Sequence, residues 1–148
     1  LKKERKELME MNAKLVFSGS KDGISESLLK EMKETEEYLS GNDGIVMNIA
    51  FNYGGRREIV EAVQRIIESG EKDINEENFY KFLYQPEIPD PELIIRTSGE
   101  FRTSNFLLWE SAYSEYYITE KLWPEFKEED LRNAVESYKK RERRFGGA

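Results

Sequence analysis

Two arginines placed six residues apart are the side chains of this chain best suited to chemistry. They lie in the segment 93–109, where an apolar run ending at Arg96 passes directly into a polar loop that contains Arg102 and Ser104. Guanidinium groups match phosphate oxygens in a bidentate way and bind them about twice as strongly as neutral donors do. Ligands of open α/β sheets gather where parallel strands end. The types and the spacing of these residues therefore predict a phosphate site at the end of a strand.

The rest of the same loop offers further donors. The hydroxyl groups of Ser98 and Thr103 and free backbone N–H groups near Gly99 could complete a cradle for an anion. A simpler interpretation makes both arginines ordinary surface partners of Glu92 or Glu100, because arginines at strand ends are common. Residue types alone leave both interpretations open.

A single carboxylate follows the basic loop. Glu115 stands at the start of a segment rich in aromatic residues, and a carboxylate near a phosphate site suits Mg²⁺, which prefers oxygen ligands and keeps several waters. The alternative is an ordinary exposed glutamate, one of many in this chain. Spacing alone does not distinguish the two.

Two other segments allow a functional and a structural interpretation. The turn 52–56, Asn-Tyr-Gly-Gly-Arg, has two glycines that let a backbone approach a phosphate, but a plain left-handed turn needs the same glycines, so we expect a mainly structural role. The basic run 139–144 suits the negative end of a helix dipole. In a more specific interpretation, the run is an arm that carries Arg144 and Gly146 into a phosphate site, either that of the same subunit or that of a neighbouring one.

The pattern of apolar residues predicts the elements that position these side chains. Strands and helices alternate, which favours an α/β fold with a parallel sheet flanked by helices, formed as a single domain by residues 1–148. The run 45–51 is almost wholly apolar, so we expect a strand covered on both faces. The expected strands are 13–17, 45–51, 92–96 and 115–119, and the expected helices are 1–12, 23–40, 57–68, 75–83, 106–113 and 128–143.

Composition excludes several classes of chemistry. Histidine and cysteine are both absent from the 148 residues, so imidazole catalysis and disulfides are excluded, and acid–base or metal chemistry must come from carboxylates. The net charge of −7 argues against general nucleic-acid binding, and no apolar stretch approaches the roughly 20 residues that cross a bilayer. The lack of cysteine fits a cytoplasmic protein. Helix-like sequence follows Leu1 with no capping residue ahead of it, so we expect the chain to begin inside a helix of a longer protein.

Several long motifs of this chain occur in the same order in one enzyme family. Asn-Ile-Ala-Phe-Asn-Tyr-Gly-Gly-Arg at 48–56, Pro-Asp-Pro-Glu-Leu-Ile-Ile-Arg-Thr-Ser-Gly-Glu at 89–100 and Arg-Glu-Arg-Arg-Phe-Gly-Gly at 141–147 resemble signatures of the cis-prenyltransferases, the undecaprenyl diphosphate synthase family. The resemblance implies an α/β layer structure with an apolar tunnel. It also implies a cytoplasmic homodimer that condenses isopentenyl diphosphate with an allylic prenyl diphosphate. The expected product is a Z-polyprenyl diphosphate, undecaprenyl diphosphate, a cell-wall lipid carrier that associates peripherally with membranes.

The same resemblance implies roles for individual residues. The arginines of the polar loop would hold the diphosphate of isopentenyl diphosphate, and Glu115 would be a ligand of the cofactor Mg²⁺. The motif at 144–146 would reach toward the substrate site across the dimer. In full, the substrate-binding residues that the resemblance implies are Arg96, Arg102, Thr103, Ser104, Arg144 and Gly146.

Three parts of the family pattern are absent. The chain lacks the Asp-Gly-Asn-Gly-Arg-Trp loop with the family's catalytic aspartate, the later Ser…Glu-Asn-Trp segment, and the histidine near the allylic diphosphate. We therefore interpret the chain as the C-terminal portion of such an enzyme, without a catalytic residue and inactive alone. One alternative is a noncatalytic partner subunit of a cis-prenyltransferase complex, against which the intact phosphate loop and Glu115 argue. Another is a generic nucleotide-binding α/β module, which the lack of a Walker or Gly-x-Gly-x-x-Gly pattern disfavours.

Overall fold

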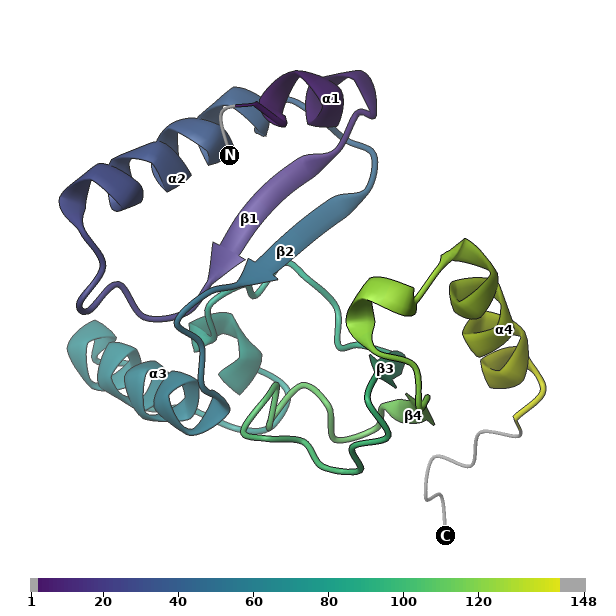
Figure 1. Cartoon of the computed structure of the whole chain (residues 1–148). Coiled ribbons are helices and arrows are strands. Elements are labelled where there is room, and N and C mark those ends of the chain that lie inside the picture. Colours follow the sequence, from purple (N-terminus) through teal and green to yellow (C-terminus); the bar gives the residue numbers. More distant parts are fainter. Residues whose placement is uncertain (1–2, 142–148) are drawn as a thin grey trace, which may run out of the picture. The chain divides into compact units, whose positions relative to one another are not determined.

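The computed structural model describes residues 3–141 and divides the chain into two compact units, Leu1–Pro86 and Glu87–Ala148 (Figure 1). Each unit contains one pair of parallel strands together with helices, so the predicted α/β class is confirmed. The single domain expected over the whole chain stays a prediction. None of the described helices is both long and apolar enough to cross a membrane.

The first unit is built on two strands, β1 (Lys14–Ser18) and β2 (Val46–Ala50), which lie side by side in Figure 1. They pair in parallel, with Lys14 opposite Val46. Helix α2 (Glu26–Leu39) connects the two strands and packs on β1. A parallel pair needs such a crossover, because a tight hairpin can join only antiparallel strands.

Helix α1 (Arg5–Glu10) is joined to α2 by a polar contact at a buried residue. Arg5 Nε donates to the Thr35 hydroxyl, 2.8 Å away, and Thr35 is fully buried. Leu15 of β1 and Leu39 of α2 are also fully buried. The core of this unit therefore lies where α2 packs on β1.

Helix α3 (Gly55–Ser69) follows β2 and packs on the short 3₁₀ helix η1 (Phe79–Phe82). It ends at Gly70, whose φ of 73° is the left-handed conformation that commonly terminates helices. A residue without a side chain adopts this conformation at little cost, so the sequence itself marks the end of α3.

A buried carboxylate ties α3 to the segment after η1. Glu58 is only 2% exposed and accepts hydrogen bonds from the Tyr53 hydroxyl and from the backbone N–H of Tyr84 (2.9 Å). The Tyr84 hydroxyl in turn donates to Glu61 Oε2, 2.9 Å away. Burial, helped by the hydrogen bond to Glu61, raises the pKa of Tyr84 to about 12.

Because of this pKa shift, the free energy of unfolding should change with pH in the alkaline range. The folded protein keeps Tyr84 protonated to higher pH than the unfolded chain does. The contribution of protonated Tyr84 to the free energy of unfolding is therefore complete below about pH 10 and is lost as the pH rises through about 12. We expect the unfolding free energy, measured by urea denaturation, to fall more steeply over this range in the wild type than in Tyr84→Phe. The variant titrates every other group in the same way, so equal slopes would contradict the assignment.

The second unit is built on β3 (Leu93–Arg96) and β4 (Glu115–Ile118), which also pair in parallel. A single 3₁₀ turn, η2 (Trp123–Glu125), precedes helix α4 (Glu128–Lys139). Helix α4 packs against both strands and so covers one face of this small sheet.

Strand β2 differs from the expectation that residues 45–51 are covered on both faces. Val46 is 46% exposed, and Met47, which points to the opposite face of the strand, is 41% exposed. The expectation is wrong for the described chain, because no described helix packs extensively on either face of β2.

The helix expected at 106–113 is also wrong. Residues 104–113 form a succession of turns, in which Ser104, Asn105 and Leu107 have φ angles of 51°, 61° and 44° that a right-handed helix does not contain. The helix expected over 75–83 is reduced to η1, and the last helix ends at Lys139 instead of continuing to 143.

Candidate functional site

Arg96 is the last residue of β3, so its side chain leaves a parallel strand at the edge where ligands of such sheets bind. Its guanidinium donates from Nη1 to the carbonyl oxygen of Arg102 (2.5 Å) and from Nη2 to the Ser104 hydroxyl (3.2 Å). The structure thus brings together three of the predicted site residues. Both acceptors are uncharged, so a phosphate oxygen would be a stronger acceptor for the same donors.

Arg102 pairs with a neighbouring acid. Its Nη2 atom lies 2.7 Å from Glu100 Oε2, with the two side chains 62% and 42% exposed. Arg102 therefore forms a surface ion pair with Glu100, as in the simpler of the two interpretations of the sequence. Exposed pairs contribute only about 0–1 kcal/mol, so a doubly charged ligand can displace Glu100 at small cost. Thr103 is exposed, and its carbonyl accepts a bond from the N–H of Phe106 (3.1 Å).

The start of the polar loop is fastened to the segment after β4. The N–H groups of Ser98 and Gly99 donate to the carbonyl oxygens of Lys121 (2.8 Å) and Thr119 (2.9 Å). These two N–H groups are therefore bonded within the fold and are not free donors for an anion. Glycine is favoured at position 99, since its φ of 65° lies in the left-handed region, which a residue without a Cβ adopts at little cost.

Glu115 lies at the other end of the strand pair from Arg96. Glu115 is opposite Leu93 in the register, whereas Arg96 is opposite Ile118, so the two site residues are separated by about 10 Å along the strands. Glu115 Oε2 is also 2.7 Å from Arg141 Nη1. No three acidic side chains of the described residues gather to hold a metal ion.

In the turn after β2, Asn52 makes structural contacts, and the expectation of a mainly structural role for the turn stays a prediction. Asn52, with a φ of 50°, donates from its side-chain amide to the carbonyl oxygens of Ser20 (2.9 Å) and Asp22 (3.0 Å). It thereby joins the end of β2 to the loop that follows β1. The remaining predicted site residues, Arg144 and Gly146, lie outside the described part of the chain.

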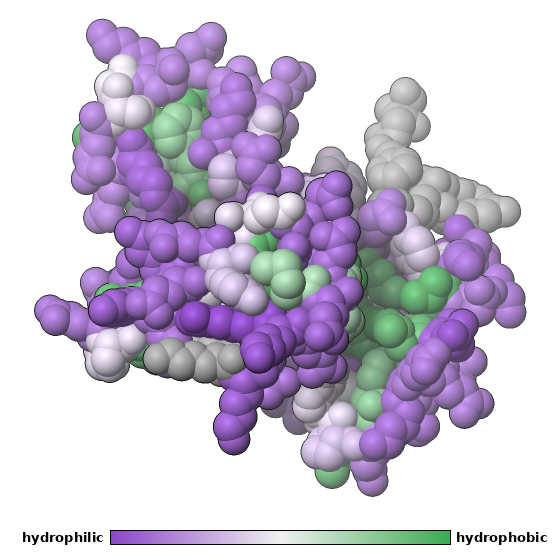
Figure 2. All heavy atoms as spheres, turned by 90° about the horizontal axis from the view of Figure 1, so that it is seen from above, coloured by the Kyte–Doolittle hydropathy of each residue, from purple (hydrophilic) through white to green (hydrophobic). Residues whose placement is uncertain are grey.

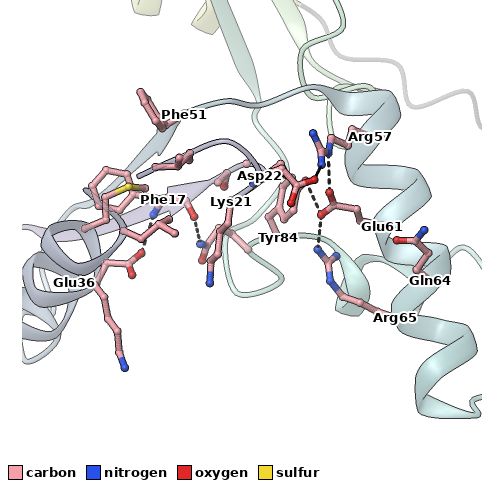
Figure 3. Close-up of a pocket in the computed structure, with 18 of the residues that line it drawn as sticks. Phe17, Lys21, Asp22, Glu36, Phe51, Arg57, Glu61, Gln64, Arg65 and Tyr84 are labelled. Carbon is pink, nitrogen blue, oxygen red and sulfur yellow. Dashed lines mark hydrogen bonds and ion pairs between the residues drawn. The ribbon is translucent and has the colours of Figure 1, made fainter. Parts of the chain in front are cut away.

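Sequence reasoning missed an open pocket in the first unit (Figure 3). It has a volume of about 1330 Å³ and is lined by α2, α3 and the segments after β1 and η1. Glu61 lies at the centre of its polar wall, 2.8 Å from Arg57 Nε and 3.4 Å from Arg65 Nη2. The spacing of these three residues, four apart along one helix face, is the sequence signal that could have found this wall. Asp22 also pairs with Arg57, so two carboxylates balance the two arginines and the wall does not identify a charged ligand.

Comparisons with known proteins show which family the chain belongs to. It matches the model of the undecaprenyl diphosphate synthases over residues 1–146. It is 55% identical over 147 residues to an isoprenyl transferase of Fusobacterium nucleatum and 56% identical over 133 residues to one of Thermotoga maritima. These matches cover 99% and 87% of this chain but 64% and 57% of the two relatives. The chain thus spans about three fifths of their length.

Solved structures agree with this assignment. A probable undecaprenyl diphosphate synthase from Campylobacter jejuni matches with a TM-score of 0.90 at 30% identity, over 99% of this chain and 69% of that one. Lavandulyl diphosphate synthase from Lavandula x intermedia, solved in complex with dimethylallyl diphosphate, matches with a TM-score of 0.91 at 35% identity, over 99% of this chain and 66% of its own. The resemblance inferred from the motifs is therefore confirmed, and the chain belongs to the undecaprenyl diphosphate synthase family of isoprenyl transferases.

Proposed function

We propose that this chain is the C-terminal portion of a cis-prenyltransferase and that it binds the diphosphate of isopentenyl diphosphate at the end of β3. The observation that carries the proposal is Arg96 at a parallel strand end, with its donors directed at the loop that holds Arg102 and Ser104. Family membership supports an isoprenoid diphosphate as the ligand, because the relatives are isoprenyl transferases and one solved relative holds dimethylallyl diphosphate.

In the reaction that we propose for the complete enzyme, an allylic prenyl diphosphate loses its diphosphate. The C3–C4 double bond of isopentenyl diphosphate supplies the electrons for a new bond between C4 and the allylic carbon, and loss of a proton from C2 leaves a Z double bond. The expected product is undecaprenyl diphosphate, made in the cytoplasm and carried peripherally on a membrane. Burial of the prenyl tail in an apolar tunnel would contribute about 0.8 kcal/mol per CH₂ group.

The contribution of this chain to that reaction is to orient the nucleophile. The incoming diphosphate replaces Glu100 at Arg102 and the neutral oxygen atoms at Arg96, and both exchanges give the guanidinium groups a more strongly charged acceptor. The Ser104 hydroxyl, already 3.2 Å from Arg96, donates to the same group. Holding the diphosphate at these points keeps C4 close to the allylic carbon, which lowers the entropy cost of the bond-forming step.

We assign Glu115 one ligand position for Mg²⁺ in the complete enzyme. Glu115 is held by Arg141 in the described chain. Metal binding at Glu115 therefore requires release of this ion pair.

We also propose that the protein forms a homodimer. Three apolar side chains of α3, Val60, Val63 and Ile67, lie three and four residues apart on one helix face and are exposed. Figure 2, a view of one face of the molecule, shows apolar residues in green at the surface among polar residues in purple. We expect sedimentation velocity to give a dimer for the wild type and a monomer for Ile67→Glu. Tyr38→Glu, at an exposed position of α2, is the matched control and should stay dimeric; a monomeric wild type would contradict the proposal.

Isothermal titration with isopentenyl diphosphate tests the proposed ligand. We expect saturable binding at one site per chain, and weaker binding of inorganic diphosphate, which has no isoprenoid tail to bury. The alternative function, a noncatalytic partner subunit that serves only as a scaffold, predicts no binding of either compound. The retained contacts among Arg96, Arg102 and Ser104 argue against that alternative, since a scaffold has no use for them.

A further inference from the structure

The polar loop begins with a backbone conformation that its own residue does not favour. Ser98 has a φ of 69°, in the left-handed region where a residue with a side chain is strained. Such conformations persist only where the surrounding structure holds them in place. Ser98 lies between Arg96 and the loop residues Arg102 and Ser104, so the contacts that hold Ser98 also affect how these donors lie relative to one another.

The contacts that hold Ser98 come from the segment after β4. The N–H of Ser98 donates to the carbonyl oxygen of Lys121 (2.8 Å), and the N–H of Gly99 donates to that of Thr119 (2.9 Å). The N–H of Thr119 in turn donates to the carbonyl oxygen of Arg96 (2.9 Å). The start of the polar loop is therefore held by residues 119–121, and its position depends on what holds that segment.

The side chain of Lys121 fastens this segment to α4. Its ammonium nitrogen lies 2.5 Å from Asp130 Oδ1, and Asp130 Oδ2 accepts a bond from the N–H of Lys127 at the start of the helix (2.8 Å). The hydrogen bond from Lys121, helped by the Lys127 N–H, lowers the pKa of Asp130, and the same bond to Asp130 raises the pKa of Lys121. Both groups are therefore charged at neutral pH.

Helix α4 is well placed to support this connection. It packs against both β3 and β4, and Ala134 in its middle is fully buried. The Asp130 side chain is only 14% exposed, whereas both side chains of the Arg132–Glu128 pair on the same helix are more than 70% exposed. A chain of contacts thus runs from α4 through Asp130 and Lys121 to Ser98.

We propose that Lys121 and Asp130 are positioning residues for the polar loop, because their ion pair fixes the backbone carbonyl that holds Ser98. This inference rests on the proposed function, since it concerns the same loop. Neither side chain needs to touch the diphosphate. Without the ion pair, the segment after β4 can shift and the loop with it, and a displacement of about 1 Å is costly where several donors must meet one ligand.

Isothermal titration of the 148-residue chain with isopentenyl diphosphate tests this role. Lys121→Met removes the charge but keeps a long side chain, and Asp130→Asn removes the charge but keeps an oxygen atom for the Lys127 N–H. We expect each change to raise the Kd by about tenfold. Lys121→Arg preserves the ion pair and should stay within about twofold of the wild type. Failure of Lys121→Arg to preserve binding would overturn the proposal.

Glu128→Gln is the matched control. It removes one negative charge from the same first turn of α4 and breaks an ion pair of similar length, 2.6 Å to Arg132, that lies within the helix and does not reach the polar loop. Its Kd should equal that of the wild type. Equal Kd values for Glu128→Gln, Lys121→Met and Asp130→Asn would overturn the positioning role alone. If the wild type did not bind isopentenyl diphosphate, the proposed function would be contradicted, and the positioning role with it.

Hydrogen exchange of individual amides, followed by NMR, separates positioning from a general loss of stability. The Ser98 amide should exchange about tenfold faster in Lys121→Met and Asp130→Asn than in the wild type, while the Ala134 amide in α4 should keep its wild-type rate. Equal acceleration at both amides would show that the ion pair supports the unit as a whole. That result, or an unchanged rate at Ser98, would overturn the proposal.

Discussion

Replacing Arg96 by alanine is expected to weaken binding of isopentenyl diphosphate by about 10- to 150-fold, because hydrogen bonds to charged groups contribute about 1.5–3 kcal/mol. Arg96 is the one loop arginine whose two observed acceptors, the Arg102 carbonyl and the Ser104 hydroxyl, are both neutral and easily exchanged for phosphate oxygens. Isothermal titration measures the change in Kd on the 148-residue chain. In the complete enzyme, the same substitution should raise the KM for isopentenyl diphosphate.

Two further variants make this test specific. Arg132→Ala removes the same charge from an exposed position of α4, where Arg132 pairs with Glu128, and should leave Kd unchanged. Arg96→Lys keeps the charge but loses the planar fork of donors, so its Kd should fall between those of the wild type and Arg96→Ala. Thermal unfolding of each variant shows whether the loop contacts of Arg96 also support the fold. Equal Kd values for Arg96→Ala and Arg132→Ala would remove Arg96 from the site.

The second large effect is the absence of turnover: the 148-residue chain alone should not condense farnesyl diphosphate with isopentenyl diphosphate. In our proposal the polar loop holds the nucleophile, but the chain lacks the Asp-Gly-Asn-Gly-Arg-Trp loop to which the family resemblance assigns the allylic diphosphate. Stabilisation of developing charge is usually the largest contribution to catalysis, and here the leaving diphosphate has no such support. Incorporation of radiolabelled isopentenyl diphosphate into longer prenyl products measures the effect, with the complete Thermotoga relative as the active reference.

A binding measurement on the same preparation controls for misfolding. If the chain binds isopentenyl diphosphate yet forms no product, the missing chemistry is that of the leaving group. Formation of longer prenyl diphosphates by the chain alone would show that its own residues support ionisation of the allylic substrate. The interpretation as an incomplete catalytic unit would then be wrong.

Local sequence patterns were sufficient for the elements whose ends and faces are encoded in adjacent residues. Helix α2 begins where the Ser25 hydroxyl accepts a bond from the N–H of Leu28, and α3 ends at Gly70. Both signals act within one helical turn, so they can be recognised without knowing the fold. The same holds for β3, whose apolar run ends at Arg96.

The polar loop shows where prediction from local sequence patterns fails. Apolar spacing at 106–113 is compatible with a helix, but the preceding loop is held by bonds from Ser98 and Gly99 to residues after β4 and by the bond from Arg96 to Ser104. These contacts join residues far apart in the chain and accompany left-handed φ angles at 104, 105 and 107. Tertiary contacts therefore override the local preference.

Residue order alone determined the family, the α/β class and the position of Arg96 at a strand end, because motifs and short-range periodicity are properties of the linear chain. Only the tertiary structure decided that Arg96 bonds Ser104, that Glu100 holds Arg102, and that Glu115 meets Arg141 at the opposite end of the strands. It also decided that, among the described strands, β2 pairs with β1 alone. The Glu115–Arg141 contact and the strand pairing depend on register and on long-range packing, which no local pattern encodes, whereas for Arg102 the structure chose between two partners that the sequence had left open.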